Sequence, residues 1–187
     1  MTRIARDTAT WIALLRAVNV GGHANIGMAD LRGLLSRLRF TDPRSLLQTG
    51  NLVFGGAGQS GEALETLLET EAARRLFLRT DFFVRSATEW RAIVDANPFR
   101  EEAERDPARL AVMCLKRAPS VDDVRALRSA ISGPETIAAA GRQLYAVYPA
   151  GMGRSKLTTA LIERTLRTRG TVRNWNTVRK LQALVDG

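Results

Sequence analysis

The chain has 187 residues, of which 45% are hydrophobic and 25% are charged, and its formal net charge is +9. This composition is typical of a soluble globular protein with one large or two small domains, and the single cysteine, Cys114, excludes an internal disulfide. No apolar run is long enough to cross a bilayer, and Asp7 interrupts the N-terminal segment, so the sequence predicts a cytoplasmic protein without a membrane partner.

Six elements are predicted in the first half of the chain. A near-continuous apolar run at 10–19 is typical of a strand buried on both faces, and leucines at helical spacing predict a helix that begins at Met28. The predicted ranges are, in order, strand 10–19, helix 28–40, strands 45–49 and 51–54, helix 61–78 and strand 81–86. This order, βαββαβ, predicts a ferredoxin-like unit over residues 1–86.

The same order of elements recurs in the second half, after a short helix at 87–96 and a polar loop at 97–107. The predicted ranges are strand 109–116, helix 121–131, strands 135–139 and 142–148, helix 157–169, a strand stub at 171–173 and an added helix at 175–185. The sequence therefore predicts an α+β fold with two ferredoxin-like units in tandem, over residues 1–86 and 87–187, and an added C-terminal helix.

The positive charge is concentrated near the C-terminus. Residues 1–86 carry 11 basic and 8 acidic side chains, whereas the segment from Arg142 onward carries 9 basic side chains against Glu163 and Asp186. A localised basic surface attracts polyanions and phosphorylated ligands. Because only three of the 28 basic residues are lysine, a general bias toward arginine is the alternative explanation.

A glycine-spaced turn lies within this basic segment. Gly151 and Gly153 precede Arg154, Ser155 and Lys156 at the predicted start of a helix. Unpaired backbone N–H groups and the helix dipole favour an anion at such a point, and Lys156 would meet a phosphate as a point charge. The alternative is a strand-to-helix connection that needs glycine for geometry and Ser155 as a helix cap. The GxxxxGK[ST] pattern is absent, and we expect no cofactor.

A second polar cluster follows at Arg173 and Asn174, next to Trp175. Arg173 is suited to hold a phosphate or carboxylate with two parallel hydrogen bonds, and Asn174 to orient a polar edge of a ligand. The alternative for Asn174 is a cap of the last helix, and for Trp175 a place in the core.

Polar residues also end the first predicted strand. Arg16 interrupts the apolar run and needs either an acidic partner within the fold or a cleft, and Asn19 follows it. Asn51 lies in a polar turn that is equally consistent with a plain hairpin. The single histidine, His23, has no second ligand nearby in sequence, and no Cys/His cluster predicts a metal site.

Several of these stretches resemble one family. Leu14–Gly22 followed by Met28–Leu31 is similar to the opening of the bacterial domain-of-unknown-function family 1697. Three further stretches match that family in order, namely Gly50–Phe54, Tyr148–Leu157 and Thr171–Thr177. The resemblance spans nearly the whole chain and implies two ferredoxin-like units. It implies no activity and no catalytic residues.

Three hypotheses for the function follow. The first is the binding of a phosphate-bearing ligand, a nucleotide or nucleic acid, by Lys156, Arg154 and Arg173. The second is a small-molecule enzyme with its site in a cleft between the two units. The third is a non-catalytic interaction protein whose motifs are turns and caps. The candidate ligand-binding residues are Arg16, Asn19, Asn51, Arg154, Ser155, Lys156, Arg173 and Asn174.

Overall fold

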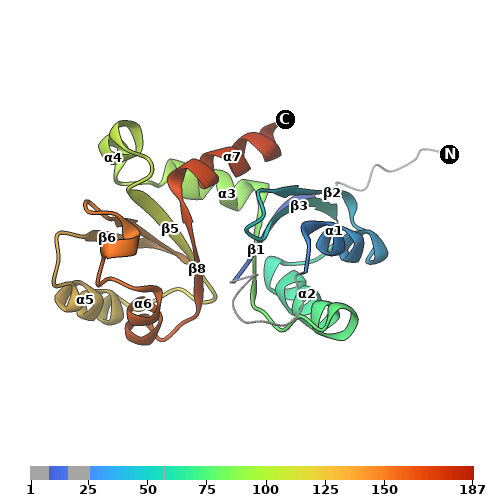
Figure 1. The fold of residues 1–187 in the computed structure, drawn as a ribbon, viewed down its shortest axis with the longest axis horizontal. Helices are drawn as coiled ribbons and strands as arrows, with labels where there is room; N and C mark the ends of the chain where they lie inside the picture. The colour runs from blue at the N-terminus through green and yellow to red at the C-terminus, as the bar shows by residue number, and fades with distance from the viewer. Residues whose placement is uncertain (1–8, 17–25, 57) are drawn as a thin grey trace. The chain divides into compact units, whose positions relative to one another are not determined.

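The computed structural model describes residues 9–16, 26–56 and 58–187. The chain forms two compact units. The first comprises Met1–Arg91 together with Leu181–Gly187, and the second comprises Ala92–Lys180. The division runs through helix α3 (Ala87–Asp95), whose first residue follows the domain boundary that the sequence predicts (Figure 1).

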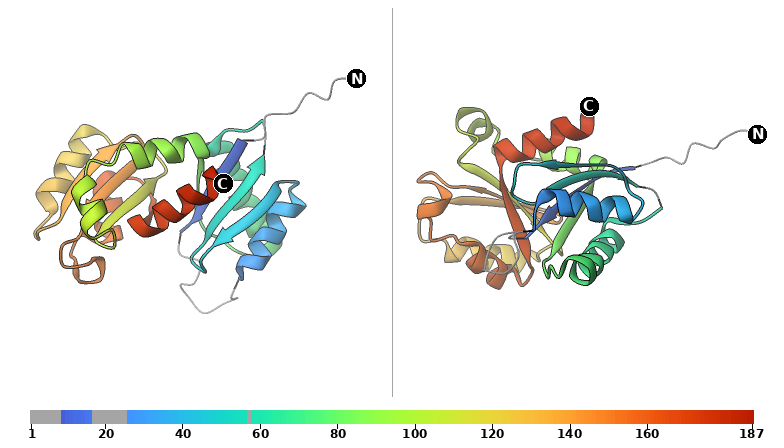
Figure 2. Two further views of the ribbon diagram at one scale, coloured as in Figure 1. Left: turned by 90° about the horizontal axis from the view of Figure 1, so that it is seen from above. Right: turned by 45° about the vertical axis from the view of Figure 1, so that its right-hand side comes forward.

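The first unit has the predicted order of elements. They are β1 (Ala9–Leu15), α1 (Met28–Arg37), β2 (Thr41–Leu46), β3 (Asn51–Gly56), α2 (Gly61–Leu76) and β4 (Phe82–Ser86). The strands form an antiparallel sheet in the order β2-β3-β1-β4, which is the ferredoxin-like topology. Helices α1 and α2 lie on one face of this sheet (Figures 1 and 2).

Strand β1 contributes buried side chains to both faces of this sheet. Alternate residues of a strand point to opposite faces, and Ala13 and Leu15 pack with the helices in one core. Ile12 and Leu14 point to the other face and are also buried. The prediction of a strand buried on both faces is therefore confirmed up to Leu15, whereas residues 17–19 of the predicted range 10–19 lie outside the described residues. The helices contribute leucines at helical spacing to this core, namely Leu31, Leu34, Leu35, Leu64 and Leu68.

The second unit repeats the topology. Its elements are α4 (Arg100–Arg105), β5 (Leu110–Leu115), α5 (Val121–Ala130), β6 (Thr136–Ala140), β7 (Gln143–Val147), the short 3₁₀ helix η1 (Met152–Arg154), α6 (Thr159–Leu166), β8 (Gly170–Asn174) and α7 (Trp175–Asp186). The sheet order is β6-β7-β5-β8, and α5 and α6 cover one face (Figure 2). Two ferredoxin-like units in tandem are thus confirmed, and α7, which belongs to both units, is the added C-terminal helix.

Three local predictions are wrong. The strand predicted at 45–49 is β2, which spans Thr41–Leu46, and residues 47–50 form the turn that follows it. The segment at 97–107, predicted as a loop, contains α4. Helix α6 begins at Thr159 and not at Leu157, because the Thr158 hydroxyl caps it by accepting the Leu161 N–H at 3.2 Å.

In the described residues, no helix combines the length and the apolar character that crossing a membrane requires.

The two units also share residues at equivalent positions. Both fourth strands contain a Val-Arg pair, Val84-Arg85 in β4 and Val172-Arg173 in β8. In each pair the guanidinium Nη1 donates to the carbonyl oxygen of the preceding valine at 2.8 Å. The two units therefore share this local arrangement as well as their order of elements.

Candidate functional site

The glycine bend lies between β7 and α6. Gly151 has φ +88°, and a Cβ atom at this position would lie 2.9 Å from Nη1 of Arg109. A side chain here would therefore be strained by the backbone conformation, whereas the flexible Arg109 side chain could move aside. A Cβ atom at Gly153 would point into open space. Of the two glycines, the geometry of the bend requires only Gly151.

Most backbone amides of the bend already have partners. The N–H groups of Gly151, Arg154 and Ser155 donate to carbonyl oxygens within the segment that begins at Tyr148. The Ser155 hydroxyl accepts the Leu157 N–H at 2.9 Å and donates to a carboxylate oxygen of Glu135. Ser155 therefore closes the bend, and the prediction that it caps the helix is wrong, since Thr158 holds that position.

The side chains of Arg154 and Lys156 are exposed on this bend. An anion at the bend would contact these two side chains rather than the backbone, because most backbone N–H groups of the bend already donate hydrogen bonds. The Glu135 carboxylate beside Ser155 contributes the opposite charge at the same place. The bend is therefore basic at its outer surface and already holds an acidic group within.

Arg173 and Asn174 end strand β8. Val172 packs into the core beneath the helices, so Arg173, the next residue along the strand, points to the opposite face of the sheet. Its Nη1 donates to the Thr171 hydroxyl at 2.9 Å, and burial lowers the pKa of the guanidinium to about 10. The Asn174 side chain accepts the Thr177 N–H at 2.9 Å at the start of α7. This bond is that of a helix cap, the alternative considered for Asn174.

The remaining candidates belong to the first unit. Asn51 is fully buried, and its amide donates to Leu46 O at 3.0 Å and to the Thr49 hydroxyl at 2.9 Å. It thus ties the β2–β3 turn, in agreement with the hairpin alternative. A guanidinium nitrogen of Arg16 lies 4.0 Å from a carboxylate oxygen of Asp81, so this charge has an acidic partner. Asn19 lies outside the described residues, as does His23.

The second unit contains a basic cavity that the sequence-based candidates do not include. It has a volume of about 360 Å³ and lies where β5 ends and α6 connects to β8. Six residues line it, namely Lys116, Arg117, Glu163, Arg167, Thr168 and Arg169. We call these residues the basic cavity.

Backbone contacts hold the two segments of the basic cavity together. Lys116 N–H donates to Arg169 O at 3.0 Å, and Arg117 N–H donates to the Thr168 hydroxyl at 3.1 Å. The Arg117 guanidinium donates to Arg167 O at 2.7 Å and so satisfies a carbonyl oxygen at the end of α6. The four basic side chains are therefore anchored on a fixed backbone, although they come from segments about 50 residues apart.

Charge in the basic cavity is strongly one-sided. Among the described residues that line it, Glu163 carries the one carboxylate, which accepts the Gly170 N–H at 2.9 Å. Arg167 has φ +52°, a left-handed conformation that usually favours glycine at a helix C-terminus. Its side chain is 81% exposed, and its Nε lies 3.7 Å from Oδ1 of Asp123. An arginine at this position supplies a cation where glycine would be less strained.

The sequence held a partial signal for this cavity. The basic side chains of 167 and 169 belong to the positive C-terminal segment, but Lys116 and Arg117 follow a buried strand far from it. Their proximity depends on the pairing of β5 with β8, in which Leu115 lies opposite Gly170. In the described part of the chain, no group of three or more His, Cys, Asp or Glu side chains is placed to hold a metal ion.

Comparisons with known proteins place this chain in a family. A solved structure of the conserved bacterial protein SP0830 from Streptococcus pneumoniae is similar, with a TM-score of 0.73 and 22% sequence identity. The similarity covers 95% of this chain and 99% of that one, and at this identity it supports the fold. No curated protein matches the chain. The family model described as "Protein of unknown function (DUF1697)" matches residues 8–145, and the chain belongs to this family.

Proposed function

We propose that the second unit binds the phosphate groups of a nucleic acid or nucleotide at the basic cavity. The observation that carries this proposal is the gathering of four cations around one carboxylate in a cavity of about 360 Å³. This volume falls within the range of about 300–1,000 Å³ that is common for small-molecule sites. The planar guanidinium group of arginine can donate two parallel hydrogen bonds to phosphate oxygens. A bound phosphate would also neutralise part of the positive charge that gathers in the cavity.

The cations of the basic cavity have to outweigh an unfavourable helix dipole. The C-terminus of a helix carries partial negative charge, which would repel an anion, and α6 ends there. Arg167 and Arg169 follow this end directly, and Lys116 and Arg117 are joined to it by hydrogen bonds. Four positive charges less the two carboxylates of Glu163 and Asp123 leave a net charge of +2, which still exceeds the half-charge of the dipole, so attraction prevails.

A polymer would use more of this surface than a single phosphate. Arg154 and Lys156 precede α6, whereas the basic cavity follows it. The eight residues of α6 separate these two places by about 12 Å. Arg164, which lies between them, is exposed. A single nucleotide would occupy one end of this surface, and an oligonucleotide would reach both, so the two kinds of ligand predict different effects of substitutions.

Fluorescence anisotropy with a labelled single-stranded DNA of about 12 nucleotides, and separately with a labelled mononucleotide, tests this proposal. Three double variants are compared, one in the basic cavity (Arg167→Ala with Arg169→Ala), one in the bend (Arg154→Ala with Lys156→Ala) and a control on α4 (Arg100→Ala with Arg105→Ala). All three remove two exposed positive charges.

We expect the cavity variant to weaken DNA binding by about tenfold or more, and the control by about threefold or less. A weaker effect of the bend variant on the mononucleotide than on DNA would identify a polymer as the preferred ligand. If the control variant loses as much affinity as the cavity variant, the binding depends only on net charge and the proposal fails.

A further inference from the structure

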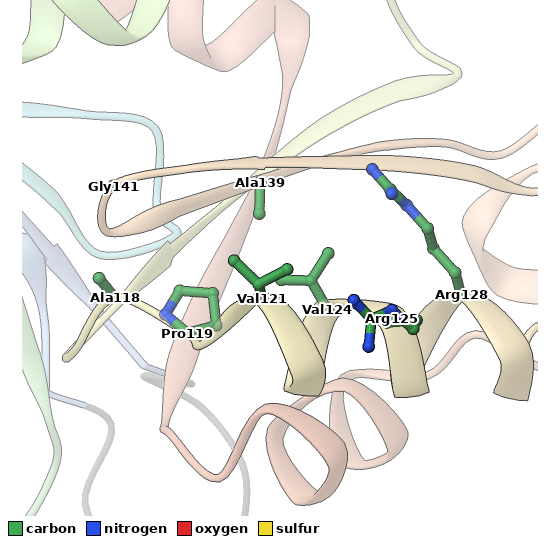
Figure 3. Close-up of a pocket in the computed structure, with 8 residues that line it drawn as sticks. All are labelled: Ala118, Pro119, Val121, Val124, Arg125, Arg128, Ala139 and Gly141. Atoms are coloured by element: carbon green, nitrogen blue, oxygen red, sulfur yellow. The ribbon is translucent and has the colours of Figure 1, made fainter.

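A second cavity of the second unit lies between helix α5 and strand β6. Its volume is about 380 Å³. Val121 and Val124 point from α5 toward the strand, and Ala139 points from β6 toward the helix (Figure 3). Arg125 and Arg128 stand at the side of this apolar floor. We call this cavity the α5–β6 groove.

Strand β6 is an edge strand of its sheet. Ala140 pairs with Gln143 across a two-residue turn, which makes this the hydrogen-bonded pair next to the turn. The following pair, which contains Ala139, is therefore a non-hydrogen-bonded pair. The backbone N–H and C=O of Ala139 point away from β7, toward the open edge. The edge thus offers donors and acceptors that another extended chain can use.

In the first unit, a side-chain hydrogen bond bridges the equivalent helix and edge strand, α1 and β2. Arg32 of α1 and Arg125 of α5 lie five residues after the cap positions of their helices. Ser45 of β2 and Ala139 of β6 both belong to the second pair from the hairpin turn. Arg32 Nη1 donates to the Ser45 hydroxyl at 2.6 Å and so bridges helix and strand.

In the second unit this bridge is missing for a chemical reason. The alanine at 139 has no acceptor in its side chain, and Arg125 instead pairs with Asp122 on its own helix, at 2.8 Å. The helix and the edge strand are therefore separated by the α5–β6 groove rather than joined by a side chain. Val121 at the groove is 76% exposed, which is unusual for an aliphatic side chain of this size.

We propose that the α5–β6 groove binds an extended acidic peptide of a partner protein, which adds a strand to β6. An aliphatic side chain of the peptide lies over Val121 and Val124. A carboxylate two residues along the peptide meets Arg128. The spacing fits, since one helical turn from Val124 to Arg128 rises about 6 Å and two strand residues span about 6.6 Å. The two arginines of the groove favour an acidic ligand, and the aliphatic side chains of Val121 and Val124 beside an open strand edge favour a peptide over a nucleic acid.

Fluorescence anisotropy with the labelled peptide Ser-Thr-Val-Thr-Leu-Thr-Asp-Thr-Ser tests this proposal. Its Val, Leu and Asp side chains share one face of a strand. A twin peptide with Lys in place of Asp is the control ligand. A third peptide, N-methylated at Leu and the residues on either side of it, cannot donate the central pairing hydrogen bonds. The protein variants are Arg128→Glu, Ala139→Ser and, as a control on α4, Arg105→Glu.

We expect the full-length protein to bind the Asp peptide at least about tenfold more tightly than the Lys twin and the N-methylated peptide. Arg128→Glu should reverse the preference between Asp and Lys, whereas Arg105→Glu should keep it. Ala139→Ser should weaken binding without loss of charge, because the serine gives Arg125 the acceptor that Ser45 gives Arg32.

Several results would overturn this proposal. The first is equal binding of the Asp and Lys peptides, and the second is an Ala139→Ser variant that binds as tightly as the original protein. Sedimentation that reveals a dimer disrupted by Arg128→Glu would assign the α5–β6 groove to a second copy of this chain. Displacement of the peptide by single-stranded DNA that persists in the basic-cavity double variant would assign it to nucleic acid.

Discussion

The buried ion pair between Glu65 and Arg85 is the sharpest test of the forces that hold the first unit. The Glu65 carboxylate lies 3.3 Å from Arg85 Nη1, and the side chains are 6% and 2% exposed. The same oxygen accepts the Val84 N–H at 2.9 Å. Glu65→Ala removes this acceptor from a buried amide and this counter-charge from a buried guanidinium. We therefore expect the free energy of unfolding to fall by about 3–5 kcal/mol.

The variant Glu65→Gln separates the two contributions. Its amide oxygen has nearly the same place and can still accept the Val84 N–H, so it should recover about 1–3 kcal/mol of the loss. Urea unfolding followed by circular dichroism measures both values, with Glu104→Ala on the exposed side of α4 as the control. The reasoning is refuted if Glu65→Ala costs no more than Glu104→Ala.

Two further predictions concern the second unit. Gly151→Ala should lower the free energy of unfolding by about 1–3 kcal/mol because of the positive φ of residue 151, whereas Gly153→Ala should change it by less than about 1 kcal/mol. Thermal unfolding that ranks the two variants in the opposite order would contradict this. Burial raises the pKa of both tyrosines, Tyr145 and Tyr148, to about 12, so their tyrosinate absorbance should stay low at pH 10–11. The folded-state pKa is raised, so this contribution to stability is fully present below about pH 10 and is lost as the pH rises through about 12. A spectrophotometric titration with its midpoint near pH 10 in the folded protein would oppose this.

The order of elements could be predicted because each element has a local signal. Leucines at helical spacing mark α1 and α2, and continuous apolar runs mark β1 and β5. Helix α4 gave no such signal, since Ala103 is its one buried residue and charged side chains occupy the rest. The start of α6 was misplaced because Ser155 and Thr158 are both hydroxyl residues before the same apolar stripe.

The candidate site could be predicted only in part. The C-terminal excess of positive charge is visible in the sequence, and it contributes Arg167 and Arg169 to the basic cavity. Lys116 and Arg117 join them through strand pairing over about 50 residues, which no local pattern reports. Asn51 was a candidate ligand-binding residue because it is polar, but its side chain is buried and donates a hydrogen bond to Leu46 O within its own turn.

The salt dependence of oligonucleotide binding tests the central claim most directly. If the cations of the basic cavity and the bend contact phosphates, about six contacts should give a slope of log K against log salt of about −4. The cavity double variant, Arg167→Ala with Arg169→Ala, should make this slope less steep by about 1–2. An affinity that does not change with salt, or a slope that this variant leaves unchanged, would contradict the account.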